Sequence, residues 1–222
     1  YYWQEGKPYF DGIRYPAFPN NDQVQLALVN GEIDWADIFI PDVENTFVAR
    51  SPEHHYWSAP TGIMVLFTLN TTKAPFNDPI VRKAISMAIN REQVVQIGMF
   101  NYTHPAIDAT GLSDAFEGWR DPAAVPEGGD WTKLDVAKAN QMLDDAGYTR
   151  RDDGIRLTKD GKPIRFDILV GAASTDWVAN SQVIAQNLKE IGMDVSVRGQ
   201  DWGLVIEQVQ KGDIFVVRPG EN

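Results

Sequence analysis

The chain has 222 residues, an apolar fraction of 43% and a formal net charge of −11. This length is enough for one large domain or two modest ones. The acidic excess and the lack of any basic run disfavour binding to nucleic acid or to an anionic membrane surface. The absence of cysteine excludes a disulfide framework, a thiolate catalyst and a cysteine-ligated zinc site.

The first third of the chain predicts short strands and one helix. Residues 13–18 suggest a strand interrupted by Pro16, and residues 22–30 suggest a short helix that ends at Gly31. Residues 63–70, IMVLFTLN, form a continuous apolar run that is typical of a buried strand.

The next segment, residues 75–95, predicts a capped helix that stops and restarts. Asp78 can accept from the free N–H groups of a helix start, and Pro79 stands where a missing N–H costs nothing. Asn90 offers a second cap. One apolar stripe connects the two caps and consists of Val81, Ala84, Ile85, Ala88 and Ile89. We therefore expect this helix to lie in the core.

Residues 105–131 predict a long connection that is rich in proline and glycine, a feature that is uncommon inside a compact domain unless it is functional or disordered. Its two tryptophans, Trp119 and Trp131, could form a lid or anchor the connection. A second helix is predicted over residues 135–146, with Gly147 directly after it.

The last third predicts a strand–helix–strand unit. Residues 164–170 and 193–197 alternate between apolar and polar side chains, and residues 178–191 have a helical stripe. Two strands joined in this way are expected to be parallel with a right-handed crossover. A last helix is predicted after Asp201.

The carboxyl ends of these two strands are the predicted place for a ligand, because ligands of open α/β sheets gather there. Asp176 and Trp177 follow the first strand, and Asp201 and Trp202 follow the second. An indole face beside polar groups suits a sugar ring or a peptide side chain. The alternative is that each tryptophan only packs its helix against the sheet.

Other residues give weaker signals. Trp57 precedes a predicted hinge or turn at residues 58–62 and suits either a binding site or a core. His54 and His55 would point to opposite faces of a strand, which argues against a shared metal ion. The paired carboxylates in helix ends and turns are expected to be solvated. We therefore predict no catalytic residue, metal site or cofactor.

The sequence of residues 75–95, PFNDPIVRKAISMAINREQVV, resembles the signature of family 5 extracellular solute-binding proteins. These are the ligand-capturing subunits of ABC importers for peptides, oligosaccharides and nickel. Further similar motifs follow in family order, namely Gly31-Glu32-Ile33-Asp34, residues 137–148 (AKANQMLDDAGY) and Ile191-Gly192-Met193-Asp194-Val195. The resemblance runs from residue 2 to about residue 214.

The resemblance implies an α/β, periplasmic-binding-protein-like fold of type II, with two lobes that close on a ligand by a hinge. The chain resembles the second half of such a protein, so its export signal would lie outside it. Residues 59–211 would form one complete ligand-binding lobe. Residues 1–58 would belong to the first lobe and the hinge, and residues 212–222 would return toward the first lobe.

In peptide-binding relatives, the positions that match Trp202, Asp176 and Thr68 line the cleft. The family pattern continues after the last helix through an apolar stretch into a tryptophan and an acidic residue that can hold a peptide amino group, and residues 215–222, FVVRPGEN, do not follow this pattern. The main ligand anchor is therefore left unassigned by the resemblance.

The leading functional hypothesis is a monomeric solute-binding subunit that delivers an oligosaccharide to ABC permease subunits, in the periplasm or outside the cell, with or without a lipid anchor. The seven tryptophans and residues 102–111 resemble the sugar-binding branch. Oligopeptides or nickel complexes are the alternative ligands. A glycan-active hydrolase that uses Asp176 and Asp201, and a scaffold or signalling module, are rivals of other classes.

Overall fold

The computed structural model describes residues 2–58, 64–106, 108–123, 129–212 and 215–219. Apart from Ser58, the predicted hinge or turn at residues 58–62 lies outside the described residues. The same holds for residues 213–214 and 220–222 of the predicted return segment.

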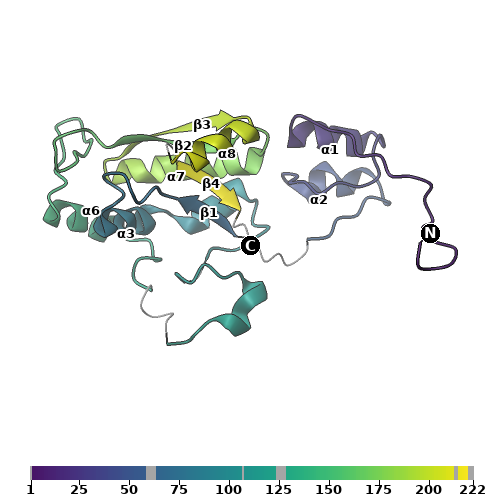
Figure 1. Cartoon of the computed structure of the whole chain (residues 1–222), viewed down its shortest axis with the longest axis horizontal. Helices are drawn as coiled ribbons and strands as arrows, with labels where there is room; N and C mark the ends of the chain where they lie inside the picture. Colours follow the sequence, from purple (N-terminus) through teal and green to yellow (C-terminus); the bar gives the residue numbers. More distant parts are fainter. Residues whose placement is uncertain (1, 59–63, 107, 124–128, 213–214, 220–222) are drawn as a thin grey trace.

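A four-stranded mixed sheet forms the centre of the molecule, in the order β1-β4-β2-β3 (Figure 1). Its strands are β1 (Val65–Thr68), β2 (Arg165–Gly171), β3 (Asp194–Gln200) and β4 (Phe215–Pro219). β2 is parallel to β3 and to β4, whereas β1 is antiparallel to β4. The predicted parallel pairing of the two alternating strands is confirmed.

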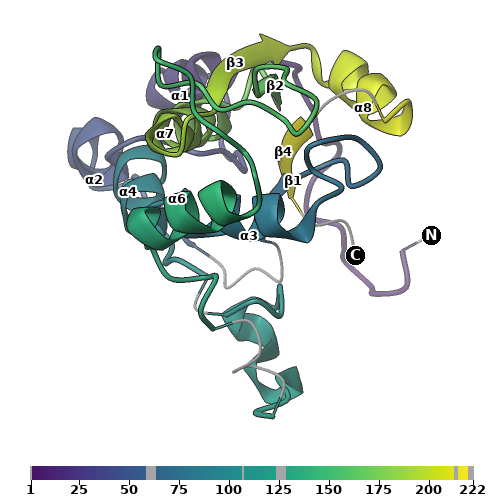
Figure 2. The same cartoon turned by 90° about the vertical axis from the view of Figure 1, so that its left-hand side faces the viewer.

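Three helices cover one face of this sheet (Figure 2). They are α3 (Pro79–Ala88), α6 (Val136–Asp145) and α7 (Thr175–Glu190). Their apolar stripes pack with β2 and β3 into the main core. Fully enclosed members of this core include Val81, Ala84, Leu143, Ile168, Leu188 and Ile191. The predicted core stripe of residues 81–89 is thereby confirmed.

The last helix, α8 (Trp202–Gln210), lies on the opposite face of the sheet (Figure 2). Its Val205 is fully buried against Leu169 of β2, and Val209 packs beside them. Because side chains alternate along a strand, Ile168 faces the three-helix core while Leu169 faces α8. The sheet is therefore covered on both faces where β2 runs.

The predicted stop and restart after α3 is confirmed. The Asp78 carboxylate accepts from the Ile80 N–H at 2.9 Å, and the Asn90 side chain accepts from the Gln93 N–H at 3.0 Å. The restart consists of α4 (Arg91–Gln93) followed by one π-helical turn, Val94–Gly98. Asp78 thus caps the start of α3, and Asn90 caps the restart after the break.

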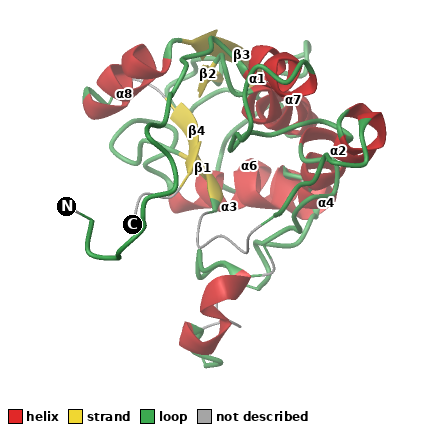
Figure 3. Cartoon of the chain, turned by 90° about the vertical axis from the view of Figure 1, so that its right-hand side faces the viewer, coloured by secondary structure: helices red, strands yellow, loops and turns green. Residues whose placement is uncertain are grey.

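The amino-terminal third contains α1 (Asn21–Val29), α2 (Val43–Thr46) and the 3₁₀ turn Val48–Arg50. These elements lie beside the sheet and the helices that cover it (Figures 1 and 3). The strand predicted for residues 13–18 is wrong, because these residues form no regular structure. Pro16 removes an N–H donor from the middle of this segment that a strand pairing would need.

The buried strand predicted for residues 63–70 is corrected in length and in burial. β1 covers only Val65–Thr68, and Val65 and Leu66 are 42% and 39% exposed. Among the described strands, β1 lies at one edge of this sheet, with β4 as its neighbour. An edge position leaves side chains uncovered that the apolar run alone assigns to an interior strand.

Within residues 105–131, the described stretch 108–123 projects away from α3 and α6 (Figure 2). We call residues 105–131 the excursion, which contains a short 3₁₀ stretch, Asp114–Trp119. An ion pair of 3.2 Å joins the buried Asp108 carboxylate to Arg120. Trp131 packs against the main core, whereas Trp119 is 80% exposed. Trp131 therefore anchors the excursion, as one of the two predictions for these tryptophans states.

Candidate functional site

The ends of β2 and β3 form one edge of the sheet. Their register pairs Gly171 with Gln200, and the Ala172 N–H donates to the Gln200 carbonyl at 2.8 Å just beyond the pair. α7 and α8 both begin within four residues of this edge. The partial positive ends of two helices therefore converge where the sequence predicts a ligand.

Trp177 and Trp202 meet at this edge. Their ring centroids are 5.6 Å apart and the ring planes are inclined by 63°, an edge-to-face contact. Trp202 is 38% exposed and Trp177 is half-buried. The predicted shared edge is confirmed. Each indole packs locally, as the structural alternative states, and the pair still presents apolar surface to solvent.

Asp176 lies beside this pair as the second residue of α7 and is only 7% exposed. Burial raises the pKa of its carboxyl, although hydrogen bonds from its own N–H and from the Trp177 N–H partly oppose the rise. The corresponding residue of the other strand behaves differently, since Asp201 is the N-cap of α8 and accepts from the Gly203 N–H at 2.9 Å. Asp176 is therefore the less hydrated of the two carboxyls.

The amino-terminal third reaches the same edge. The Asn21 N–H donates to the Ala173 carbonyl at 3.4 Å, and the Asn21 side-chain amide lies 3.5 Å from the Thr175 hydroxyl. The sequence does not predict this contact. The N-cap Asn20 signals a helix start, but nothing in the sequence reveals what that start lies against.

The other two predicted site residues lie elsewhere. Thr68 ends β1, which runs opposite to β2, and its backbone partner Val216 is level with Leu169 rather than with the strand ends. Trp57 is 84% exposed and lies two residues before the undescribed residues 59–63. The structure thus brings together Trp177, Trp202 and Asp176, and it does not bring Thr68 or Trp57 to them.

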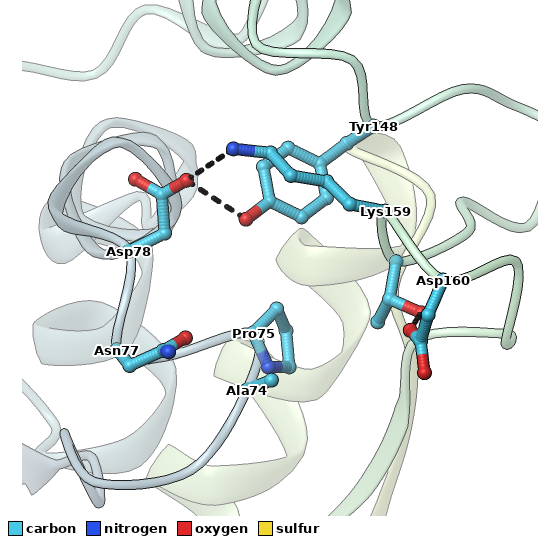
Figure 4. A pocket seen from close by; sticks show the side chains of 8 residues that line it. Ala74, Pro75, Asn77, Asp78, Tyr148, Lys159 and Asp160 are labelled. Carbon is cyan, nitrogen blue, oxygen red and sulfur yellow. Dashed lines mark hydrogen bonds and ion pairs between the residues drawn. The ribbon is translucent and has the colours of Figure 1, made fainter.

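Away from the tryptophan pair, a cavity of about 460 Å³ opens where α3 begins (Figure 4). The Asp78 carboxylate there accepts from the Tyr148 hydroxyl at 2.9 Å and from the Lys159 ammonium at 3.0 Å. Burial alone would raise the pKa of Asp78, but the hydrogen bonds from Lys159, the Ile80 N–H and Tyr148 lower it overall. Burial and the bond to Asp78 raise the pKa of Tyr148 to about 12. The charges of Asp78 and Lys159 neutralise each other, and their ion pair holds the turn before β2 against the start of α3.

Among the described residues, no three His, Cys, Asp or Glu side chains are placed to share a metal ion. His54 stacks on Phe47 with ring centroids 4.2 Å apart, and His104 contacts Asp114. Within the described part of the chain, no helix is long and apolar enough to span a membrane.

Known proteins resemble this chain over nearly its whole length. The glutathione-binding protein GsiB of Escherichia coli K12 is 26% identical over 211 residues, which are 94% of this chain and 36% of that protein. GsiB of Salmonella typhi gives the same figures. The chain therefore spans little more than a third of the length of these relatives.

Solved structures agree in fold. A periplasmic oligopeptide-binding protein of Thermotoga maritima, with mannohexaose bound, has a TM-score of 0.78 and 25% identity over 90% of this chain and 38% of its own. AgaA of A. tumefaciens R10, in complex with agropinic acid, has a TM-score of 0.74 and 22% identity over 99% of this chain and 41% of its own. This mixed α/β fold therefore matches part of such periplasmic proteins.

The sequence also matches, over residues 1–220, the family described as bacterial extracellular solute-binding proteins, family 5 Middle. Because that match covers almost every residue, the chain belongs to the family 5 bacterial extracellular solute-binding proteins.

Proposed function

We propose that the complete gene product that carries this chain is the solute-binding subunit of an ABC importer, and that it holds an oligosaccharide against the Trp177–Trp202 pair. The observation that carries this proposal is the edge-to-face meeting of two indoles at the carboxyl edge of the sheet. Binding is reversible and transforms nothing, in keeping with the family.

The pair suits a saccharide for a physical reason. A pyranose ring has an apolar face of C–H groups and a polar rim, and an indole offers a flat apolar surface for that face. Two inclined indoles offer two such surfaces, and the helix starts beside them leave N–H groups for hydroxyl oxygens. The mannohexaose bound to the Thermotoga maritima protein supports this ligand class.

Oligopeptides are the second candidate. The relatives named for glutathione bind a tripeptide by name, and tryptophan surfaces also accept peptide side chains. A nickel complex is a weaker alternative, because the three residues that meet at the edge include a single carboxylate and no histidine.

The architecture that we propose for the complete protein has two lobes that close by a hinge. Residues 59–211 form the ligand-binding lobe, while residues 1–58 and 212–222 belong with the other lobe. The hydrogen bonds of Asn21 across the strand edge support this arrangement, since they bring the amino-terminal third to the site. The protein acts as a monomer outside the cytoplasmic membrane and delivers its ligand to the permease subunits.

A thermal-shift screen of the complete gene product tests the ligand class. Manno-, cello- and xylo-oligosaccharides are compared with glutathione and with di- to pentapeptides. A ligand that binds the native state raises Tm, by an amount that grows with the ratio of its concentration to Kd. We expect a saccharide to give the largest rise, and a rise with peptides alone would replace the oligosaccharide by the second candidate.

The site is tested by Trp202→Ala, with Trp119→Ala as the control on the excursion. We expect the first change to weaken the best saccharide about tenfold or more, because it removes one of two stacking surfaces. Trp119→Ala is expected to leave Kd unchanged. Equal affinities of the two variants would exclude the site, and release of a hydrolysed product would exclude the binding-protein function.

A further inference from the structure

The indole of Trp202 lies directly on a glycine. A Cβ atom built on Gly171 would be 3.0 Å from Cε3 of Trp202 and 3.7 Å from Cζ3, with the Ser174 Oγ at 3.9 Å. A separation of 3.0 Å between two carbon atoms is well inside their optimal contact distance. Any side chain at residue 171 would therefore require the benzo edge of the indole to shift by a few tenths of an ångström.

The need for a glycine here is one of space, not of backbone conformation. Gly171 ends a regular strand and does not have a positive φ, unlike Gly147 or Gly192. An alanine could adopt the same backbone angles. The one consequence of adding a methyl group is the contact with its neighbours, and the nearest of these is Trp202.

The packing of α8 explains why Trp202 comes so close. Leu169 and Gly171 are two residues apart and so share a face of β2. α8 lies on that face with Val205 against Leu169. Trp202 precedes Val205 by three residues, nearly one turn, and so lies over Gly171. Because Gly171 has no side chain, the first turn of α8 can lie directly against the end of β2.

The contact between Trp202 and Trp177 depends on how closely Trp202 lies against the strand at Gly171. Trp202 touches Gly171 with one edge and meets Trp177 at 5.6 Å and 63°. A displaced Trp202 would change that distance and inclination, and with them the apolar surface shown to solvent.

We propose that Gly171 is the positioning residue of the tryptophan pair: it sets the depth of Trp202 and thereby the geometry of the surface that receives the saccharide. This inference rests on the proposed function for its ligand, but the coupling between Gly171 and Trp202 can be measured without any ligand.

The test compares Gly171→Ala with Gly118→Ala in the complete gene product. Gly118 is a matched control, because a Cβ there would meet no atom within 4 Å. Near-ultraviolet circular dichroism reports the mutual orientation of indoles. We expect Gly171→Ala to change this spectrum, to lower Tm by about 2 °C or more, and to weaken saccharide binding about tenfold. Gly118→Ala is expected to do none of these.

The double variant Gly171→Ala/Trp202→Ala decides how the glycine acts. If the methyl group acts through the indole, its effects on the spectrum and on Tm disappear once Trp202 is absent. An unchanged spectrum for Gly171→Ala, or an equal loss of Tm in both backgrounds, would overturn the inference. If Gly171→Ala alone does not fold, recovery of folding in the double variant supports the inference and failure to recover overturns it.

Failure of the proposed function is recognised separately. If Trp202→Ala binds saccharide as the wild type does, the ligand assignment fails, while the spectrum and the Tm comparison still judge the coupling between Gly171 and Trp202.

Discussion

Asp176 and Asp78 show how local surroundings set the chemistry of a single residue. Both lie in the first turn or cap of a helix, where N–H groups favour a negative charge. The pKa of Asp176 is nevertheless raised, because burial dominates and no cation faces it in the interactions that shift it. The pKa of Asp78 is lowered, because Lys159 and Tyr148 donate to it. The neighbouring groups, rather than the position in the helix, therefore decide whether the pKa of each carboxyl is raised or lowered.

The first prediction concerns Asp176→Asn. A carboxyl whose pKa is raised in the folded state stabilises the native protein fully below the unfolded value of 3.8, and this stability is lost as pH rises through the folded pKa. The variant has no charge to bury, so we expect it to gain stability relative to the wild type between pH 4 and pH 7. Urea unfolding midpoints of both proteins across this range provide the measurement. Parallel pH profiles would contradict the expectation.

The second prediction concerns Arg156, whose side chain is 1% exposed. Its guanidinium donates to the Ile191 carbonyl at 2.9 Å and to the Asn140 side chain at 2.9 Å, and it contacts Asp144. Arg156→Ala removes these contacts and leaves the buried Ile191 carbonyl without its guanidinium donor, and we expect a loss of about 3 kcal/mol in the free energy of unfolding.

The control for this measurement is Arg151→Ala. Arg151 pairs with Asp153 at 3.1 Å on the surface, where both side chains are more than 40% exposed. Its removal is expected to cost less than about 1 kcal/mol. Similar urea midpoints for the two variants would show that the burial of Arg156 carries no special stability.

At the scale of elements, helix starts are coupled to distant turns. The cap of α3 also holds Lys159, which lies 81 residues away in the turn before β2 (Figure 4). The Asn187 side chain in α7 likewise accepts from the Asn90 N–H at 3.0 Å and donates to Gln93 at 3.1 Å, across the break after α3. At each of these two places, a single polar side chain, Asp78 or Asn187, holds two elements together.

The third prediction concerns Asp78→Asn. Asparagine also caps helices, so the change removes the charge and retains the cap. A carboxyl with a lowered folded pKa contributes stability above its unfolded value of 3.8 and loses it as pH falls through the folded pKa. We expect a loss of about 1 kcal/mol at pH 7 that shrinks below pH 4.

Thermal unfolding of the wild type and Asp78→Asn at pH 7 and pH 3 checks this. Lys159→Met is the companion variant, and the double variant should lose less than the sum of the two single changes. Strict additivity would show that the pair of 3.0 Å contributes nothing.

The elements that could be predicted from sequence are those with a local signal. The caps Asp78 and Asn90, the alternation of residues 164–170 and the parallel pairing across α7 all follow from spacing and side-chain chemistry. The exposed edge position of β1 could not be predicted, because an apolar run states only that a strand is apolar and not which strands flank it. The approach of Asn21 to Thr175, over 154 residues, has no local signal either.

The whole molecule divides into a tightly packed lobe and less enclosed parts beside it. The main core joins α3, α6 and α7 to the sheet, whereas α2 packs into a small separate cluster around Ile40, Val43 and Phe47. The excursion has its own internal support, since Arg120 also donates to the Leu112 carbonyl at 2.9 Å. We expect these parts to open independently of the lobe.

The fourth prediction follows for Arg120→Ala. Loss of the ion pair with the buried Asp108 leaves that carboxylate without its cation, so the excursion should open more often. Limited proteolysis should cleave within residues 105–131 faster than in the wild type, with Tm of the lobe unchanged. Arg165→Ala, which breaks an exposed pair with Asp194, is the control. Equal cleavage rates in the two variants would contradict the prediction.

The position of β4 determines the order in which the lobe can be completed during synthesis. β4 is the only described strand beside β1, and it joins β1 to β2 although about 150 residues separate it from β1. β2, α7 and β3 can pair as soon as they emerge from the ribosome, because their contacts are local. β1 must wait until residues 215–219 have been made, and so long a closure is slow. A nascent chain that stalls before residue 215 therefore keeps the backbone donors and acceptors of β1 unpaired, in a form that a chaperone or a second chain can bind.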